Sequence, residues 1–154
     1  MTTLVTLDFD ARIPASPEEV FDRLADLGHY DRWLPSSAAF GGLEALSESP
    51  VRAGTTYRDR GPAATWQGRV TACERPERLT FVQTTALRLG ILPARMAIEI
   101  EYRLRASSGG GTALRRHYAL RGPWYLWPAR ARLREQTRPE NLRILELLER
   151  SFGP

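Results

Sequence analysis

Six short runs with strand character, separated by turns, fill the sequence between residues 40 and 120. In most of them apolar residues recur at every second position, which is typical of a β-strand with one buried face. The runs are Phe40–Ser47, Thr55–Arg60, Thr65–Cys73, Leu79–Thr85, Arg95–Ala106 and Thr112–Leu120. The turns between them contain Gly or Pro and are shorter than the crossover of about a dozen residues that parallel strands need. The sequence therefore predicts an antiparallel meander.

A further strand and two short helices precede this meander. Residues 5–13 alternate between apolar and polar side chains, as expected for a half-buried strand. Ser16, Pro17 and Glu19 follow it and form the pattern of a capping box with Pro at the first helical position. We expect one helix to begin here and a second, shorter one to cover residues 29–34.

The last quarter of the chain is predicted to be one long helix. Pro128 is placed to open it, and Leu142, Leu145 and Leu148 give it an apolar stripe. The predicted fold class is α+β, with a curved seven-stranded antiparallel sheet wrapped around the C-terminal helix. An internal apolar cavity is expected between the sheet and the helix, within a single domain of residues 1–154.

The residue composition excludes several kinds of chemistry. All 22 basic residues are Arg, so Schiff-base catalysis and a Lys-containing phosphate loop are excluded. One Cys and two His cannot complete a structural zinc site, and one Cys cannot form an internal disulfide. We therefore expect neither a metal nor a cofactor.

Charge and hydropathy give expectations about partners and location. The net charge is +4, but the Arg residues are spread along the chain rather than clustered, which favours a solvated basic surface over a nucleic-acid interface. No apolar run approaches the length of about 18 residues that a membrane span needs. The beginning of the sequence lacks the pattern of a signal peptide. We expect a cytoplasmic protein without stable membrane insertion.

Five stretches carry a resemblance to a known family. They are Ile13–Phe21, His29–Pro35, Trp66–Val70, Pro76–Phe81 and Asn141–Glu149. Together with the order of the predicted strands and helices, these stretches resemble the helix-grip superfamily (SRPBCC). This superfamily includes START lipid-transfer domains, birch-pollen-allergen-like proteins and aromatase/cyclases. The chain is most similar to its polyketide cyclase/dehydrase-like group. The resemblance implies a cavity for a small hydrophobic ligand, whereas the fold also hosts enzymes, carriers and receptors.

Strand phase predicts which side chains face this cavity. The candidate ligand-binding residues are Tyr57, Trp66, Arg69, Phe81, Gln83, Met96, Ile98, Tyr102, Trp124 and Asn141. The candidate catalytic residues are Arg116, Asp59 and Tyr118. Arg116 is the polar exception on an apolar strand face, and a buried guanidinium is costly unless paired. It is expected to pair with Asp59, to lie at a strand end open to water, or to polarise a carbonyl or bind a carboxylate of a ligand.

Arg69 is a candidate for a different reason. An inward Arg on the strand after a Trp positions the substrate in cyclases of the resembling group, and Trp66 with Arg69 is similar. The two residues are three positions apart, however, so a regular strand directs them to opposite faces. Without a bulge between them, Arg69 points to the solvent.

Two apolar loops complete the set of candidates. Residues 87–93 connect two predicted strands, and residues 123–128 lead into the last helix. Because loops are normally polar, these either fold over the end of the core, gate the cavity, form a dimer contact or dock on a membrane. We favour a gate or a homodimer contact.

Three functions fit the sequence. The first is a small-molecule binding protein that acts as a cyclase, aromatase or dehydratase on a polyketide-like substrate. In this case Arg116 and tyrosines orient carbonyl groups, and water, Tyr118 or Asp59 moves protons. The second is a non-catalytic carrier of a lipid or metabolite, and the third is a protein-binding module of the chaperone-regulator type. Nucleic-acid binding ranks below all three.

Overall fold

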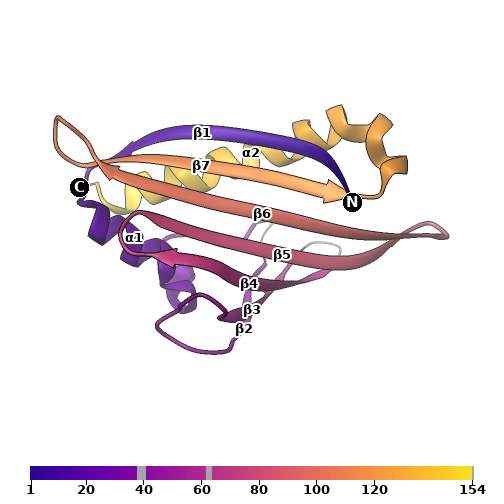
Figure 1. Ribbon diagram of the computed structural model, residues 1–154, viewed down its shortest axis with the longest axis horizontal. Helices are drawn as coiled ribbons and strands as arrows, with labels where there is room; N and C mark the ends of the chain where they lie inside the picture. The colour runs from indigo at the N-terminus through magenta and orange to yellow at the C-terminus, as the bar shows by residue number, and fades with distance from the viewer. Residues whose placement is uncertain (38–40, 62–63, 154) are drawn as a thin grey trace.

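A computed structural model describes residues 1–37, 41–61 and 64–153 and contains one seven-stranded antiparallel sheet (Figure 1). Along the sheet the strands follow the order β1-β7-β6-β5-β4-β3-β2, so that only β1 lies out of sequence order. The strands are β1 (Thr2–Ile13), β2 (Gly42–Leu46), β3 (Thr56–Arg60), β4 (Thr65–Glu74), β5 (Arg78–Leu89), β6 (Leu92–Ala106) and β7 (Thr112–Gly122). The predicted α+β fold with its antiparallel meander is confirmed.

The helices lie on one side of the sheet. Helix α1 (Pro17–Ala25) and the short 3₁₀ helix η1 (Leu27–Arg32) follow β1, and the 3₁₀ helix η2 (Trp124–Ala129) leads from β7 into α2 (Arg130–Ser151). The long helix α2 runs along β1 and β7, whereas α1 lies near its C-terminal end (Figure 1). The prediction placed Pro128 at the start of α2, but Pro128 belongs to η2.

The start of α1 is the capping box that the sequence predicts. Ser16 Oγ accepts a hydrogen bond of 3.2 Å from the amide of Glu19, and the Ser16 amide donates to Glu19 Oε2 at 3.2 Å. These two bonds satisfy backbone and side-chain groups that the first turn of a helix otherwise leaves unpaired.

The β5–β6 hairpin is longer than predicted. The segment between residues 86 and 94 was predicted to be a loop, but β5 continues to Leu89 and β6 begins at Leu92, with Leu89 opposite Leu92. Gly90, with φ of +66°, makes the tight turn between them. The alternation of side chains therefore continues to the end of this hairpin. The predicted start of β2, Phe40, lies outside the described residues.

The register of the sheet confirms the predicted strand phase around the cavity. Asp59 lies opposite Trp66, Gly68 opposite Gln83, and Phe81 opposite Ile100. A β-bulge occurs in β4, but only beyond Val70, so it does not change which of these side chains point inward. In the same way Tyr102 lies opposite Arg116, which brings both to the helix side of the sheet.

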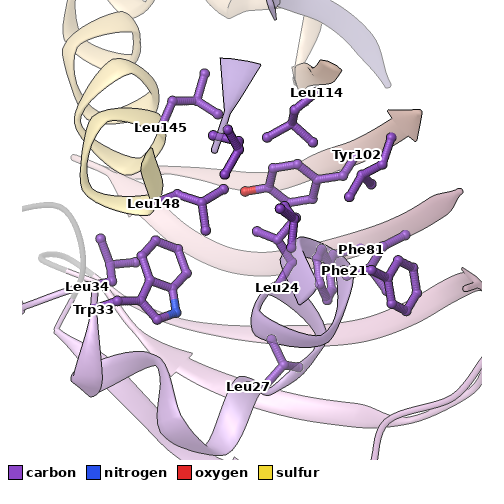
Figure 2. Close-up of a cluster of buried hydrophobic side chains, with 14 of the residues drawn as sticks. Phe21, Leu24, Leu27, Trp33, Leu34, Phe81, Tyr102, Leu114, Leu145 and Leu148 are labelled. Carbon is purple, nitrogen blue, oxygen red and sulfur yellow. The ribbon is translucent and has the colours of Figure 1, made fainter. Parts of the chain in front are cut away.

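Two hydrophobic clusters form the core. The larger joins α1, η1 and the C-terminal half of α2 to the sheet, and Figure 2 shows Leu24, Tyr102, Leu145 and Leu148 converging there. The smaller lies where β1, β6 and β7 meet the start of α2, and includes Leu4, Met96 and Leu120. Between the two clusters the sheet and α2 leave an open space.

Candidate functional site

A cavity of about 230 Å³ lies between the sheet, η1 and α2. Most of its wall is aromatic or aliphatic and comes from both hydrophobic clusters. The polar lining residues are Arg116, Asn141, Asp59, Gln83, Gln136, Thr137, Glu140, Arg60 and the tyrosines Tyr30, Tyr57, Tyr102 and Tyr118. An apolar cavity with a few polar groups is typical of a small-molecule binding site.

Arg116 is the most deeply buried charge in this wall, with 3% of its surface exposed. Its Nε donates a 2.8 Å hydrogen bond to Oδ1 of Asn141 on α2, and its Nη1 donates to the hydroxyl of Tyr102 on β6. Asn141 in turn donates from Nδ2 to the carbonyl of Thr137 at 2.9 Å, which fixes the orientation of its amide. The network thus joins β7, β6 and α2 at one end of the cavity.

The partners of Arg116 are neutral. Of the alternatives that the sequence left open, pairing with Asp59 is not observed: within the described ranges Arg116 forms no ion pair, and its Nη2 donates no hydrogen bond. Its positive charge is therefore not cancelled by a carboxylate. Because the side chain lines the cavity, a ligand oxygen is a suitable partner for the remaining donors.

Asp59 lines the cavity from β3, and burial raises its pKa to about 7. Its carboxyl makes no hydrogen bond or ion pair with the described part of the chain. A carboxyl group with this pKa is present in both protonation states near neutral pH. It is therefore able to give or take a proton without a large energetic cost.

Two tyrosines present unpaired hydroxyls to the cavity. Burial raises the pKa of Tyr118 to about 12. The pKa of Tyr57 is held well above its usual value, mainly by burial and to a smaller extent by the negative charge of the nearby Asp59. Both hydroxyls therefore stay protonated at neutral pH and are hydrogen-bond donors. Neither donates to another described residue.

Gly68 sets the position of one of these tyrosines. The ring of Tyr57 lies so close to Gly68 that a Cβ at residue 68 would be 2.2 Å from Cζ of the ring. Tyr57 also packs edge-on against Phe81, with ring centroids 6.0 Å apart, and Phe81 does the same against Tyr102 at 6.4 Å. These rings form a row of edge-to-face contacts along the sheet side of the cavity.

The structure places ten of the thirteen predicted site residues in the cavity wall. They are Tyr57, Asp59, Trp66, Phe81, Gln83, Ile98, Tyr102, Arg116, Tyr118 and Asn141. Arg116 and Asp59 do not contact each other. Across the sheet, Arg116 is aligned with Leu79 of β5, whereas Asp59 is aligned with Thr85, six residues further along that strand. They mark opposite ends of the lining.

Three predicted residues lie outside the cavity wall. Arg69 is exposed on the outer face of β4, because no bulge separates it from Trp66. Met96 lies opposite Thr85 and points inward, but it belongs to the smaller hydrophobic cluster. Trp124 is 77% exposed in η2.

The helix side of the cavity was largely missed by sequence reasoning. Tyr30 and Leu34 reach it from the segment around η1, and Gln136, Glu140 and Ile144 reach it from α2. The α2 residues recur every four positions, which places them on one helix face, so their spacing contained the signal. Tyr30 was not among the candidates, because its segment was predicted only as a short helix. Its hydroxyl donates a hydrogen bond to the carbonyl of Leu24.

Other site types find no support in the described residues. No group of three or more His, Cys, Asp or Glu within residues 1–37, 41–61 and 64–153 is placed to hold a metal ion. His29 and His117 pair with Asp26 and Asp8 outside the cavity. Among the described helices, none has the length and apolar content needed to span a membrane.

Solved structures share this fold at low sequence identity. The di-domain ARO/CYC StfQ of the steffimycin biosynthetic pathway is similar with a TM-score of 0.72 and 13% identity over 97% of this chain, which corresponds to 50% of StfQ. Protein MLL2253 from Mesorhizobium loti has a TM-score of 0.67 and 18% identity over 95% of both chains. Ara h 8.0201 has a TM-score of 0.63 and 11% identity over 96% of this chain and 97% of its own. These likenesses show the fold.

A family comparison goes further than the fold. No curated protein matches the chain. One family sequence model does, described as polyketide cyclase / dehydrase and lipid transport, and it covers residues 5–150. The resemblance to the helix-grip superfamily is confirmed by this match together with the structural neighbours. The match covers nearly the whole sequence, and the cavity between sheet and helix agrees with it. The chain therefore belongs to the polyketide cyclase/dehydrase and lipid transport family.

Proposed function

We propose that this chain binds a compact aromatic, polyketide-like molecule with ketone or carboxylate oxygens and catalyses proton transfer on it, as a cyclase or dehydratase requires. One observation carries the proposal: Arg116 is buried in an apolar cavity wall with only neutral partners. An uncompensated buried charge is unfavourable for folding alone. A ligand oxygen at the free side of the guanidinium would compensate it.

The size of the cavity favours a compact ligand. Its volume of about 230 Å³ lies just below the range of about 300–1,000 Å³ that is usual for ligand pockets. The edge-to-face rings of Tyr57, Phe81 and Tyr102 offer flat apolar surfaces. Together these features suit fused rings better than a long acyl chain, which argues against a lipid carrier. An open cavity also argues against a purely protein-binding module.

The proposed reaction step uses Asp59 and Tyr57. The carboxylate of Asp59 removes a proton from a ligand carbon next to a ketone, and the electron pair of that C–H bond moves to the ketone oxygen. Tyr57, on the same strand face, donates a hydrogen bond to the resulting enolate. The proton then returns from Asp59 to the ligand, so no oxidant or cofactor is consumed. Arg116 holds a second ligand oxygen at the other end.

A matched pair of probes tests the binding part. 6-Carboxy-α-tetralone is a bicyclic aromatic ketone with a carboxylate at the far end of its skeleton, and α-tetralone is the same ketone without the carboxylate. We expect calorimetry to show tighter binding of 6-carboxy-α-tetralone, and we expect Arg116→Gln to remove most of this preference. Arg115→Gln is the control, because Arg115 is exposed on the same strand. Equal binding of both probes, or no effect of Arg116→Gln, would contradict the proposal.

The catalytic part has a separate readout. In deuterium oxide the hydrogens next to the ketone of 6-carboxy-α-tetralone exchange for deuterium when the ketone enolises. We expect the protein to accelerate this exchange and Asp59→Asn to abolish the acceleration while the ligand still binds. Asp31→Asn, at an exposed position, should leave the rate unchanged. Binding without acceleration would point to a carrier instead of an enzyme.

A further inference from the structure

Five large apolar side chains are exposed together at one end of the sheet. Leu89, Ile91 and Leu92 form the β5–β6 turn, and Trp124 and Trp127 belong to η2; we refer to these five residues as the apolar tip. Ile91 is 90% and Trp124 77% exposed. With Met1, they are the large hydrophobic residues that the described part of the chain leaves exposed. Both segments of the tip lie at the same end of the molecule (Figure 1).

The two segments of the apolar tip are held together by the structure beneath them. The hydroxyl of Tyr125 in η2 donates a hydrogen bond to the carbonyl of Pro93 in β6. Leu126 of η2 packs on the smaller hydrophobic cluster, as does Leu87 of β5. The apolar tip is therefore a preformed surface, and its β5–β6 turn extends beyond the neighbouring strands (Figure 1). None of its residues lines the cavity.

Positive charge borders the apolar tip on both sides. Arg88, Arg95 and Arg121 are exposed and alternate with inward residues, so they lie on the outer face of the sheet near the tip. On the helix side, Arg130 and Arg132 are exposed in the first turn of α2, and Arg130 stacks 4.1 Å above the ring of Trp127. The sequence contains no Asp or Glu between residues 78 and 98 or between residues 102 and 134.

We propose that the apolar tip docks onto an anionic lipid bilayer. Trp is favoured at the boundary between lipid head groups and acyl chains, and Arg near a membrane surface binds anionic head groups. A protruding apolar turn suits insertion into a soft interface. A second copy of the chain fits less well, because a two-fold contact would place the same acid-free Arg clusters against each other. The inference does not depend on the ligand of the cavity.

Cosedimentation with lipid vesicles tests this surface. We expect the protein to bind vesicles of phosphatidylcholine with phosphatidylglycerol, to bind pure phosphatidylcholine weakly, and to be released by high salt. Replacing Ile91 and Trp124 by Ser should weaken binding roughly tenfold or more, since each side chain loses its apolar burial in the interface. Both side chains are exposed, so the thermal unfolding curve should not move.

A matched pair on β6 tests the charges. Arg95→Gln, next to the apolar tip, should weaken vesicle binding about fivefold. Arg105→Gln, exposed at the opposite end of the same strand, should have no effect. The proposal is overturned if the protein does not sediment with anionic vesicles, or if the Ser variants bind like the wild type. A solution dimer that Ile91→Ser dissociates would also overturn it, by identifying a second copy as the occupant.

Discussion

Arg116 and Asn141 are joined by a 2.8 Å hydrogen bond from Nε to Oδ1, and each side chain is only 3% exposed. The bond connects β7 to α2 at the point where the sheet and the helix enclose the cavity. It therefore has two effects, because it holds the helix against the sheet and fixes a positive charge in the cavity wall.

The first prediction concerns the stability of this contact. Arg116→Ala leaves Asn141 and Tyr102 without their donor, and an unsatisfied buried polar group costs about 1–3 kcal/mol, so the free energy of unfolding should fall by that order. Asn141→Ala should have a similar cost, and the double variant should lose less than the sum. Urea unfolding measures all three. Arg115→Ala, whose partner Asp10 is exposed, should cost about 0–1 kcal/mol. Strictly additive losses would show that the two side chains act independently.

Gly68→Ala is the second prediction. The added methyl group would collide with the ring of Tyr57 and displace it, which we expect to cost about 1–3 kcal/mol. Thermal unfolding measures the loss. Gly28→Ala is a suitable control, because its Cβ would meet Leu46 at an ordinary 3.7 Å. In a Tyr57→Ala background the cost of Gly68→Ala should nearly disappear; if it persists, the ring is not the cause.

The third prediction is a pH dependence of stability from Asp59. Its pKa is about 7 in the folded state and about 3.8 when unfolded, so the folded state binds more protons between these values. Stability should therefore fall as the pH rises from about 4 to about 7 and then level off. Comparing urea unfolding of wild type and Asp59→Asn at pH 4 and pH 8 isolates this contribution. The variant should gain relative to wild type by more than about 1 kcal/mol at the higher pH. The same difference in Asp31→Asn would exclude a specific effect of Asp59.

The fourth prediction separates the two faces of β4. Trp66 lines the cavity and Arg69 does not. Trp66→Ala should weaken α-tetralone binding roughly tenfold, because a large apolar contact is lost, whereas Arg69→Ala should leave the affinity unchanged within about twofold. Calorimetric titration of both variants makes the comparison. A large loss in Arg69→Ala would mean that this side chain reaches the ligand after all.

The sheet side of the site was predictable because alternation along a strand fixes the side on which a residue lies. Tyr57, Phe81, Tyr102 and Arg116 were placed correctly for this reason. The partner of Arg116 was not predictable, since Asn141 is 25 residues away and on another element. Which turn of α2 lies above which row of the sheet is decided by packing between layers, and no local pattern contains that information.

The β5–β6 hairpin was misassigned for a related reason. Its apolar end was predicted to be a loop, although the alternation continued through Leu87 and Leu89. The apolar residues at the end of this hairpin are exposed and do not pack against a core, so their apolar character did not identify them as parts of strands. Only the structure shows that they lie beside η2.

The neutral partners of Arg116 also affect how the net charge of the cavity lining changes with pH. A guanidinium stays charged at every physiological pH. The other charged lining residues, Arg60 and Glu140, are paired with Glu44 and Arg143. Among the described lining residues the net charge therefore depends on Asp59, and it changes from zero above pH 7 to +1 below it. An anionic ligand would be held more tightly in a mildly acidic medium and released in an alkaline one.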